Sequence, residues 1–88
     1  MFVELIPLGS VISVFKDQVV VVKIDNPSRI PELGSRAYHK RGLRQVGIVS
    51  DIIGPTREPY AVIKMIQGAS VSVGEELVYE PRRRKRVR

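Results

Sequence analysis

Six short segments rich in β-branched residues constrain the fold of this chain more than any other feature. They cover residues 8–15, 18–24, 35–39, 46–53, 60–66 and 76–80. Glycine and proline punctuate the stretches between most of them, and no segment has the 3.6-residue period of an amphipathic helix. Short strands separated by turn signals about every 8–12 residues are typical of all-β sandwiches and barrels. We therefore predict an all-β fold.

The second segment favours closure of the sheet. Val19–Val22 is a run of four valines without a charge, and such a run on an exposed edge would promote aggregation. Closing the sheet into a barrel removes the edges. A chain of 88 residues has room for one small core. We predict a single domain over residues 1–81, a small closed or partly closed β-barrel of about six strands.

The turns between the segments differ in kind. Lys16 and Asp17 join the first two segments and indicate a two-residue hairpin, although neither is glycine. Residues 25–34 contain two prolines and a glycine, which predicts a long irregular connection. Residues 40–44, KRGLR, form a basic turn before the fourth strand.

The net charge of +6 arises at the C-terminal end of the chain. Residues 1–81 contain nine Lys/Arg and nine Asp/Glu, so the excess comes from Arg82, Arg83, Arg84, Lys85, Arg86 and Arg88. We predict that this basic tail, residues 82–88, contacts the phosphate backbone of RNA. The alternatives are a solubilising charge run, a disordered end or a fragment of a longer native terminus.

The composition argues against an enzyme. The chain has no cysteine and a single histidine, His39, which is expected to be a surface residue because no second base, nucleophile or ligand cluster accompanies it. We therefore predict no catalytic residue, no metal and no cofactor. The absence of a long apolar run or of a signal-like leader predicts a cytoplasmic protein.

The stretch Val46–Met65 predicts two strands joined by a turn that contains Gly54, Pro55 and Pro59. Side chains alternate between the two faces of a strand, and the charges of Asp51 and Lys64 indicate the outer face. This alternation places Val49, Ile53, Tyr60 and Val62 outside, and Ile48 and Ile63 in the core. An outer face with so many apolar residues is typical of a protein-binding surface.

Nine residues of this stretch are the candidate contacts with a protein partner: Gly47, Val49, Asp51, Ile53, Gly54, Pro55, Pro59, Tyr60 and Val62. For several of these residues, a structural role is the alternative to a contact with the partner. Gly47 either permits a bulge or tight bend or clears space for a partner side chain, and Asp51 is either solvated or turn-capping or an interfacial ion-pair partner. The Gly54–Pro55 pair serves the turn or touches the partner. Tyr60 is either an interface anchor or a core residue.

The joint spacing of these residues resembles the Gar family, the small β-barrel subunits of box H/ACA ribonucleoproteins, which are RNA-guided pseudouridine synthases. The resemblance rests on Val46-Gly47-Ile48-Val49, Asp51, Gly54-Pro55, Pro59-Tyr60 and Ile63-Lys64. It extends to an opening Leu-Gly-x-Val-Ile segment, to Val73-Gly74-Glu75 and to the basic end. Without glycine/arginine-rich flanks, the chain is similar to the minimal archaeal form.

The resemblance implies a non-catalytic subunit that binds the catalytic domain of the synthase and promotes loading and release of substrate RNA during rRNA pseudouridylation. Guide RNA and substrate RNA would then be contacted mostly indirectly, and the chain would be monomeric within a multi-subunit particle. The alternative is a stand-alone RNA-binding barrel of the oligonucleotide-binding type, which stacks bases on aromatic side chains. Valine and isoleucine dominate the central strands, which favours protein binding.

Overall fold

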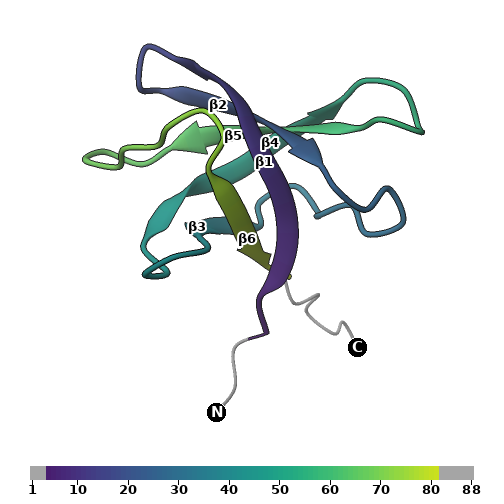
Figure 1. Cartoon of the computed structure of the whole chain (residues 1–88), viewed down its shortest axis with the longest axis horizontal. Helices are drawn as coiled ribbons and strands as arrows, with labels where there is room; N and C mark the ends of the chain where they lie inside the picture. The colour runs from purple at the N-terminus through teal and green to yellow at the C-terminus, as the bar shows by residue number, and fades with distance from the viewer. Residues whose placement is uncertain (1–3, 82–88) are drawn as a thin grey trace, which may run out of the picture.

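The computed structural model describes residues 4–81, which form six antiparallel strands and no helix. The strands are β1 (Ile6–Phe15), β2 (Val19–Ile24), β3 (Arg36–His39), β4 (Gln45–Ile53), β5 (Tyr60–Met65) and β6 (Glu76–Glu80). They close into a barrel in the order β1-β2-β5-β4-β3-β6 (Figure 1). The predicted all-β fold and closed barrel are confirmed. The predicted basic tail, residues 82–88, lies outside the described residues, and no membrane-spanning helix is found within residues 4–81.

The β1–β2 hairpin turns through Lys16 and Asp17, as predicted. Both residues have positive φ, 52° and 55°, which is the signature of a type I′ turn. The Gln18 N–H donates to the Phe15 carbonyl at 2.9 Å and closes the turn. This turn type matches the right-handed twist of the strands, so the twist is accommodated without glycine at the cost of two left-handed residues.

The core lies inside the barrel and is built by alternate residues of the strands. Its buried members are Leu8, Val11, Val20, Val22, Ile24, Ala37, Val46, Val49, Ala61, Ile63, Leu77 and Tyr79. The run of valines therefore splits: Val20 and Val22 are buried, whereas Val19 and Val21 point outward and are half-buried. Burial of these apolar side chains is the main force that holds the barrel together.

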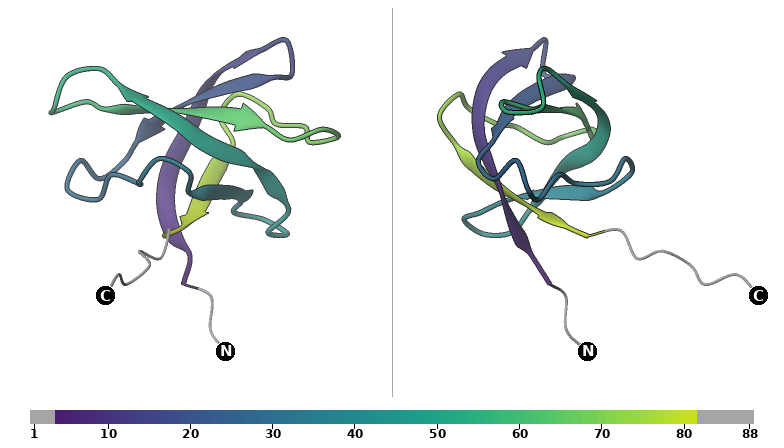
Figure 2. Two further views of the ribbon diagram at one scale, coloured as in Figure 1. Left: turned by 180° about the vertical axis from the view of Figure 1, so that it is seen from behind. Right: turned by 90° about the vertical axis from the view of Figure 1, so that its right-hand side faces the viewer.

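The residues before β3 complete the wall of the barrel. The connection from residue 25 to residue 35 is irregular, as predicted, and ends beside β4 (Figure 2). The Gly34 N–H donates to the Val49 carbonyl, and the Val49 N–H donates to the Ser35 carbonyl, each at 2.8 Å. The buried Ser35 hydroxyl donates to the Glu32 carbonyl at 2.6 Å, so its polar group is satisfied.

Two irregularities in β4 overturn the predicted orientation of Val49 and Ile48. The pairing of β4 with β3 shifts at Val46, and its pairing with β5 shifts between Val49 and Asp51, where Ser50 is the extra residue. Val49 is only 1% exposed and lies in the core, whereas Ile48 is 41% exposed. The prediction that Val49 faces outward and Ile48 inward is wrong, because an inserted residue reverses the alternation along the strand.

Candidate functional site

The outer face of β1, β2, β5 and β4 carries three rows of paired residues that run across the four strands. One row is Phe15, Val19, Lys64 and Ile48, and the next is Ser13, Val21, Val62 and Asp51. The third row is Ser10, Lys23, Tyr60 and Ile53. Paired residues on one face of a sheet lie within about 5.5 Å of each other at Cβ, so the rows form one surface.

The apolar members of these rows make up what we call the docking face: Phe15, Val19, Val21, Ile48, Ile53, Tyr60 and Val62. Phe15 is 61% exposed and Ile53 44% exposed, and the others are exposed or half-buried. Seen from behind, β4 and β5 lie toward the viewer, with the loop between them projecting at one corner (Figure 2, left). Lys23, Asp51 and Lys64 lie among the apolar residues and are exposed.

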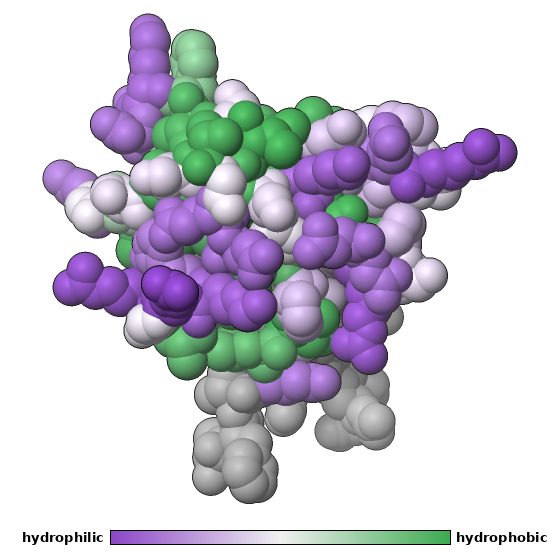
Figure 3. Space-filling view, in the orientation of Figure 1, coloured by the Kyte–Doolittle hydropathy of each residue, from purple (hydrophilic) through white to green (hydrophobic). Residues whose placement is uncertain are grey.

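Apolar surface also extends around β1. Ile12 is exposed at an irregularity in the β1–β2 pairing, next to Ser13. Figure 3 shows apolar side chains gathered over the upper part of β1, toward the β1–β2 hairpin. A sheet face that is apolar over four strands is unusual for a surface that remains in water.

The predicted contact residues fall into two groups. Asp51, Ile53, Tyr60 and Val62 lie on the outer face as predicted, and Gly54 and Pro55 lie in the exposed loop that follows β4. Gly47, Val49 and Pro59 are buried and offer no surface to a partner. The carbonyl of Pro59 accepts the Ile24 N–H at 3.1 Å, so this proline belongs to the wall between β2 and β5.

Gly47 is required by the barrel itself. A Cβ at this position would come 2.1 Å from the carbonyl oxygen of Lys64 and 2.9 Å from Cα of Met65. No side chain tolerates such an approach to backbone atoms, so β4 and β5 can meet here only through glycine. The structural role of Gly47 therefore accounts for the residue without a partner.

Tyr60 packs against the start of the β4–β5 loop. A Cβ on Gly54, whose φ is +92°, would lie 2.9 Å from Cδ1 of the Tyr60 ring. The turn that follows is closed by the Glu58 N–H, which donates to the Pro55 carbonyl at 3.0 Å. Glycine at position 54 thus supplies both the left-handed backbone and the space for the ring, which holds Tyr60 at the edge of the docking face.

Asp51 stabilises the bulge in β4. Its Oδ1 accepts the Ile52 N–H at 2.8 Å, and the neighbouring Ser50 hydroxyl donates to the Val62 carbonyl at 3.2 Å. Among the ion pairs of the described residues, Asp51 takes no part. The carboxylate is therefore exposed and locally bonded, and its ion pair with a partner stays a prediction.

Four members of the docking face were not among the predicted contacts: Phe15, Val19, Val21 and Ile48. The period-two pattern of β2 could have indicated Val19 and Val21, because alternate valines must face opposite sides of the sheet. Which pair lies outside depends on the closure of the barrel. Ile48 was missed because the bulge at Ser50 is invisible in the sequence pattern.

Polar contacts join the opposite side of the barrel, around β3 and β6. The Tyr38 hydroxyl donates to Oε1 of Glu80 at 3.0 Å, and burial, followed by this carboxylate, raises the pKa of Tyr38. Nδ1 of His39 lies 2.8 Å from Oε2 of Glu75. Oε1 of Glu75 accepts the Ser72 N–H at 2.9 Å, and this hydrogen bond, with help from His39, lowers the pKa of Glu75. His39 therefore belongs to a structural contact between β3 and the turn before β6.

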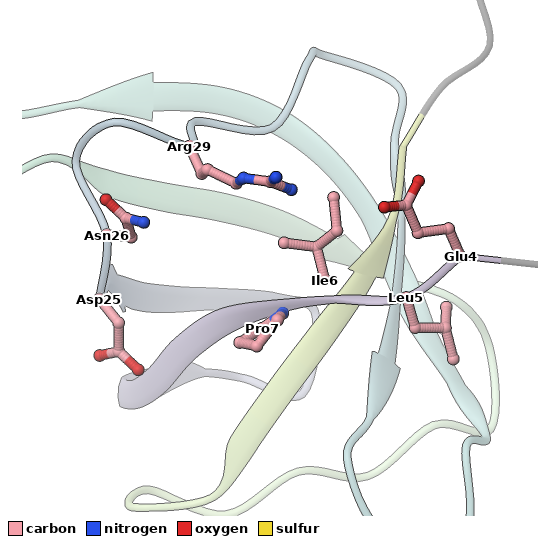
Figure 4. Close-up of a pocket in the computed structure, with 7 residues that line it drawn as sticks. All are labelled: Glu4, Leu5, Ile6, Pro7, Asp25, Asn26 and Arg29. Carbon is pink, nitrogen blue, oxygen red and sulfur yellow. The ribbon is translucent and has the colours of Figure 1, made fainter.

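A hollow of about 460 Å³ lies where β1 begins, beside the connection that follows β2 (Figure 4). Its apolar lining residues are Leu5, Ile6 and Pro7, while Glu4, Asp25 and Arg29 bring charges of both signs. No group of three or more potential metal-ligating side chains occurs in residues 4–81. The hollow thus contains no cluster of groups with an evident chemical role.

Comparison with known proteins agrees with the resemblance at the level of the family. The family model described as the Gar1/Naf1 RNA binding region matches residues 5–87. A solved structure described as the Gar1 domain of Naf1 is similar, with a TM-score of 0.71 and 18% identity, covering 89% of this chain and 87% of that chain. This similarity supports the fold alone, and no curated protein sequence gives a significant match. Because the family model spans almost the entire sequence, the chain belongs to the Gar1/Naf1 family.

Proposed function

We propose that this chain is a non-catalytic subunit of a box H/ACA ribonucleoprotein that binds the catalytic domain of the pseudouridine synthase. The docking face supports this proposal: seven outward residues on four strands form one apolar surface with charges among them. Protein interfaces have such apolar centres with polar residues around them. Phe15 and Tyr60 are the largest members of the docking face and are suited to be its anchors.

The role in the reaction is to promote loading and release of substrate RNA. A subunit that binds the synthase changes turnover only if its affinity differs between two states of the synthase. The subunit itself performs no chemistry, needs no cofactor, and acts as one copy in a cytoplasmic particle. Residues 82–88 contribute sequence-independent contacts with RNA phosphates.

Direct RNA binding by the barrel is the second candidate, and the description of the family model as an RNA binding region favours it. The docking face is a poor platform for bases, because only Phe15 and Tyr60 on it are aromatic and they lie in different rows. We therefore assign the docking face to a protein partner.

Binding of the purified synthase subunit in the absence of RNA tests this proposal. Ile48→Glu replaces an apolar contact by a carboxylate that must lose its water in the interface, and is expected to weaken binding by at least about 100-fold. Ile30→Glu is the matched control, because Ile30 is also an isoleucine with 41% exposure but lies in the connection after β2. Equal affinities of the two variants, or binding of RNA and not of the synthase by the wild-type chain, would contradict the proposal.

A further inference from the structure

The turn between β3 and β4, Lys40–Arg44, is a local concentration of positive charge. From Ser35 to Ser50 the chain has four Lys/Arg residues and no carboxylate. Three of the four, Lys40, Arg41 and Arg44, belong to this turn, which we call the basic turn. All three are exposed.

The backbone holds the basic turn in a defined shape. The His39 N–H donates to the Arg44 carbonyl at 2.9 Å, and the Lys40 N–H donates to the Glu76 carbonyl at 3.1 Å. Gly42 and Leu43 both have positive φ, 81° and 55°, so the tip reverses within two residues. Leu43 carries a Cβ in this left-handed conformation, which costs about 1 kcal/mol. The backbone of the turn is therefore held in place, and its cationic side chains extend from it.

The charges of this turn are largely unneutralised. Nζ of Lys40 lies 3.0 Å from Oε1 of Glu76, but both side chains are more than half exposed, and such a pair is weak in water. Arg41 and Arg44 take no part in the ion pairs formed within residues 4–81. Two guanidinium groups are thus available to an anion.

The basic turn lies far from the β4–β5 loop, which borders the docking face at its other end. In Figure 1 the turn lies at the lower left and the β4–β5 loop at the upper right, and the view from behind keeps them apart (Figure 2, left). Figure 3 shows hydrophilic side chains along the left side of the molecule, with apolar side chains below them. A partner on the β4–β5 side of the docking face would leave the turn accessible.

We propose that the basic turn binds the phosphodiester backbone of RNA. Guanidinium groups match phosphate oxygens in a bidentate geometry, and flexible exposed arginines suit contacts that do not depend on base sequence. A protein interface would need an apolar centre, whereas the turn offers only Leu43. The basic turn shares no residue with the docking face, and its binding of RNA does not depend on the proposed function.

The test is the salt dependence of binding between the full chain and a fluorescent oligouridine, without synthase. The double variant Arg41→Gln/Arg44→Gln is compared with Lys16→Gln/Arg57→Gln, which removes the same charge from two exposed residues in other loops. Each phosphate contact with single-stranded nucleic acid contributes about 0.7 to the slope of log K against log salt, so the first variant should lower it by about 1.4. The second variant should retain the wild-type slope.

Equal losses in the two double variants would show a general effect of net charge and overturn the proposal, as would an unchanged slope in both. Binding of polyglutamate, a polyanion without phosphates, is measured in the same way. If the first variant weakens polyglutamate binding as much as oligouridine binding, the turn recognises any polyanion, and the assignment to RNA is wrong. Synthase binding by the first variant is expected to match that of the wild type, so failure here and failure of the docking face are distinguishable.

Discussion

Val49 and Ile63 pair directly in the antiparallel ladder of β4 with β5, and both side chains point into the core of the barrel. On the other side of the same strands, Ile48 pairs with Lys64 and is exposed. This arrangement separates residues that stabilise the fold from residues that are available to a partner, although they are neighbours in the sequence.

Truncation of Val49 should therefore destabilise the monomer. Val49→Ala is expected to lower the free energy of unfolding by about 2 kcal/mol, since it removes buried methyl groups and leaves a cavity. Ile48→Ala should change it by less than about 0.5 kcal/mol, as is usual at exposed positions. Urea denaturation of both variants measures the difference. A larger loss for Ile48→Ala would mean that the orientation of β4 is reversed.

Gly47→Ala should destabilise the barrel without any partner present. The added methyl group would meet the carbonyl oxygen of Lys64 at 2.1 Å, and relieving this contact requires the two strands to separate. We expect a cost of about 3 kcal/mol, at the upper end of overpacking effects. Gly68→Ala is the control, because its φ of +87° is unfavourable for alanine but nothing lies within 4 Å of the new Cβ. If both variants lose equally little stability, close approach of the strands does not explain Gly47.

The first hairpin can be stabilised by a single substitution. Asp17 has φ 55°, and Asp17→Gly removes the unfavourable left-handed conformation of a residue with a Cβ. The expected gain is about 1 kcal/mol in thermal or urea unfolding. Asp17→Ala keeps the Cβ and should give no gain, which distinguishes backbone strain from loss of the carboxylate.

Glu75 should make stability depend on pH at the acidic end. The hydrogen bond from the Ser72 N–H, together with His39, lowers the pKa of Glu75 below its ordinary value of 4.5. A carboxyl group with a lowered pKa in the folded state stabilises the fold above about pH 4.5, and this contribution is lost as the pH falls through the folded-state pKa. In the Glu75→Gln variant, the urea midpoint should fall less than in the wild type as the pH is lowered from 5 to acidic values. Glu58→Gln, in the exposed β4–β5 loop, controls for the loss of one carboxylate. In this variant the urea midpoint should depend on pH as it does in the wild type.

Addition of the chain to a guide-RNA complex that lacks it should raise pseudouridine formation under multiple-turnover conditions and leave single-turnover rates nearly unchanged. This is the expected result for a subunit that assists loading and release and not the chemical step. Val62→Glu, which places a charge in the centre of the docking face, should abolish the increase, whereas Ile30→Glu should preserve it. An increase that survives Val62→Glu would place the synthase contact elsewhere on the barrel.

The sequence by itself determined the strands and the chemistry of the surface. The ends of all six strands were predicted to within two residues. This was possible because runs of β-branched residues favour strands, and the glycines and prolines beside them end the strands, whatever the rest of the fold. The outer face of β5 was also predicted correctly, with Tyr60, Val62 and Lys64 outward, since β5 pairs with β2 and β4 without a bulge of its own.

Only the tertiary structure decided which side of β4 faces the core and how the apolar face extends over four strands. The extra residue Ser50 exists only relative to the pairing partner Val62, so no local pattern along β4 reveals it. The strand order likewise places β2 beside β5, which are separated in the sequence by two other strands. Barrel closure requires strands to bend and coil, and bulges provide that bending, so the geometry of the closed sheet, more than the alternation within one strand, selects Ile48 for the surface and Val49 for the core.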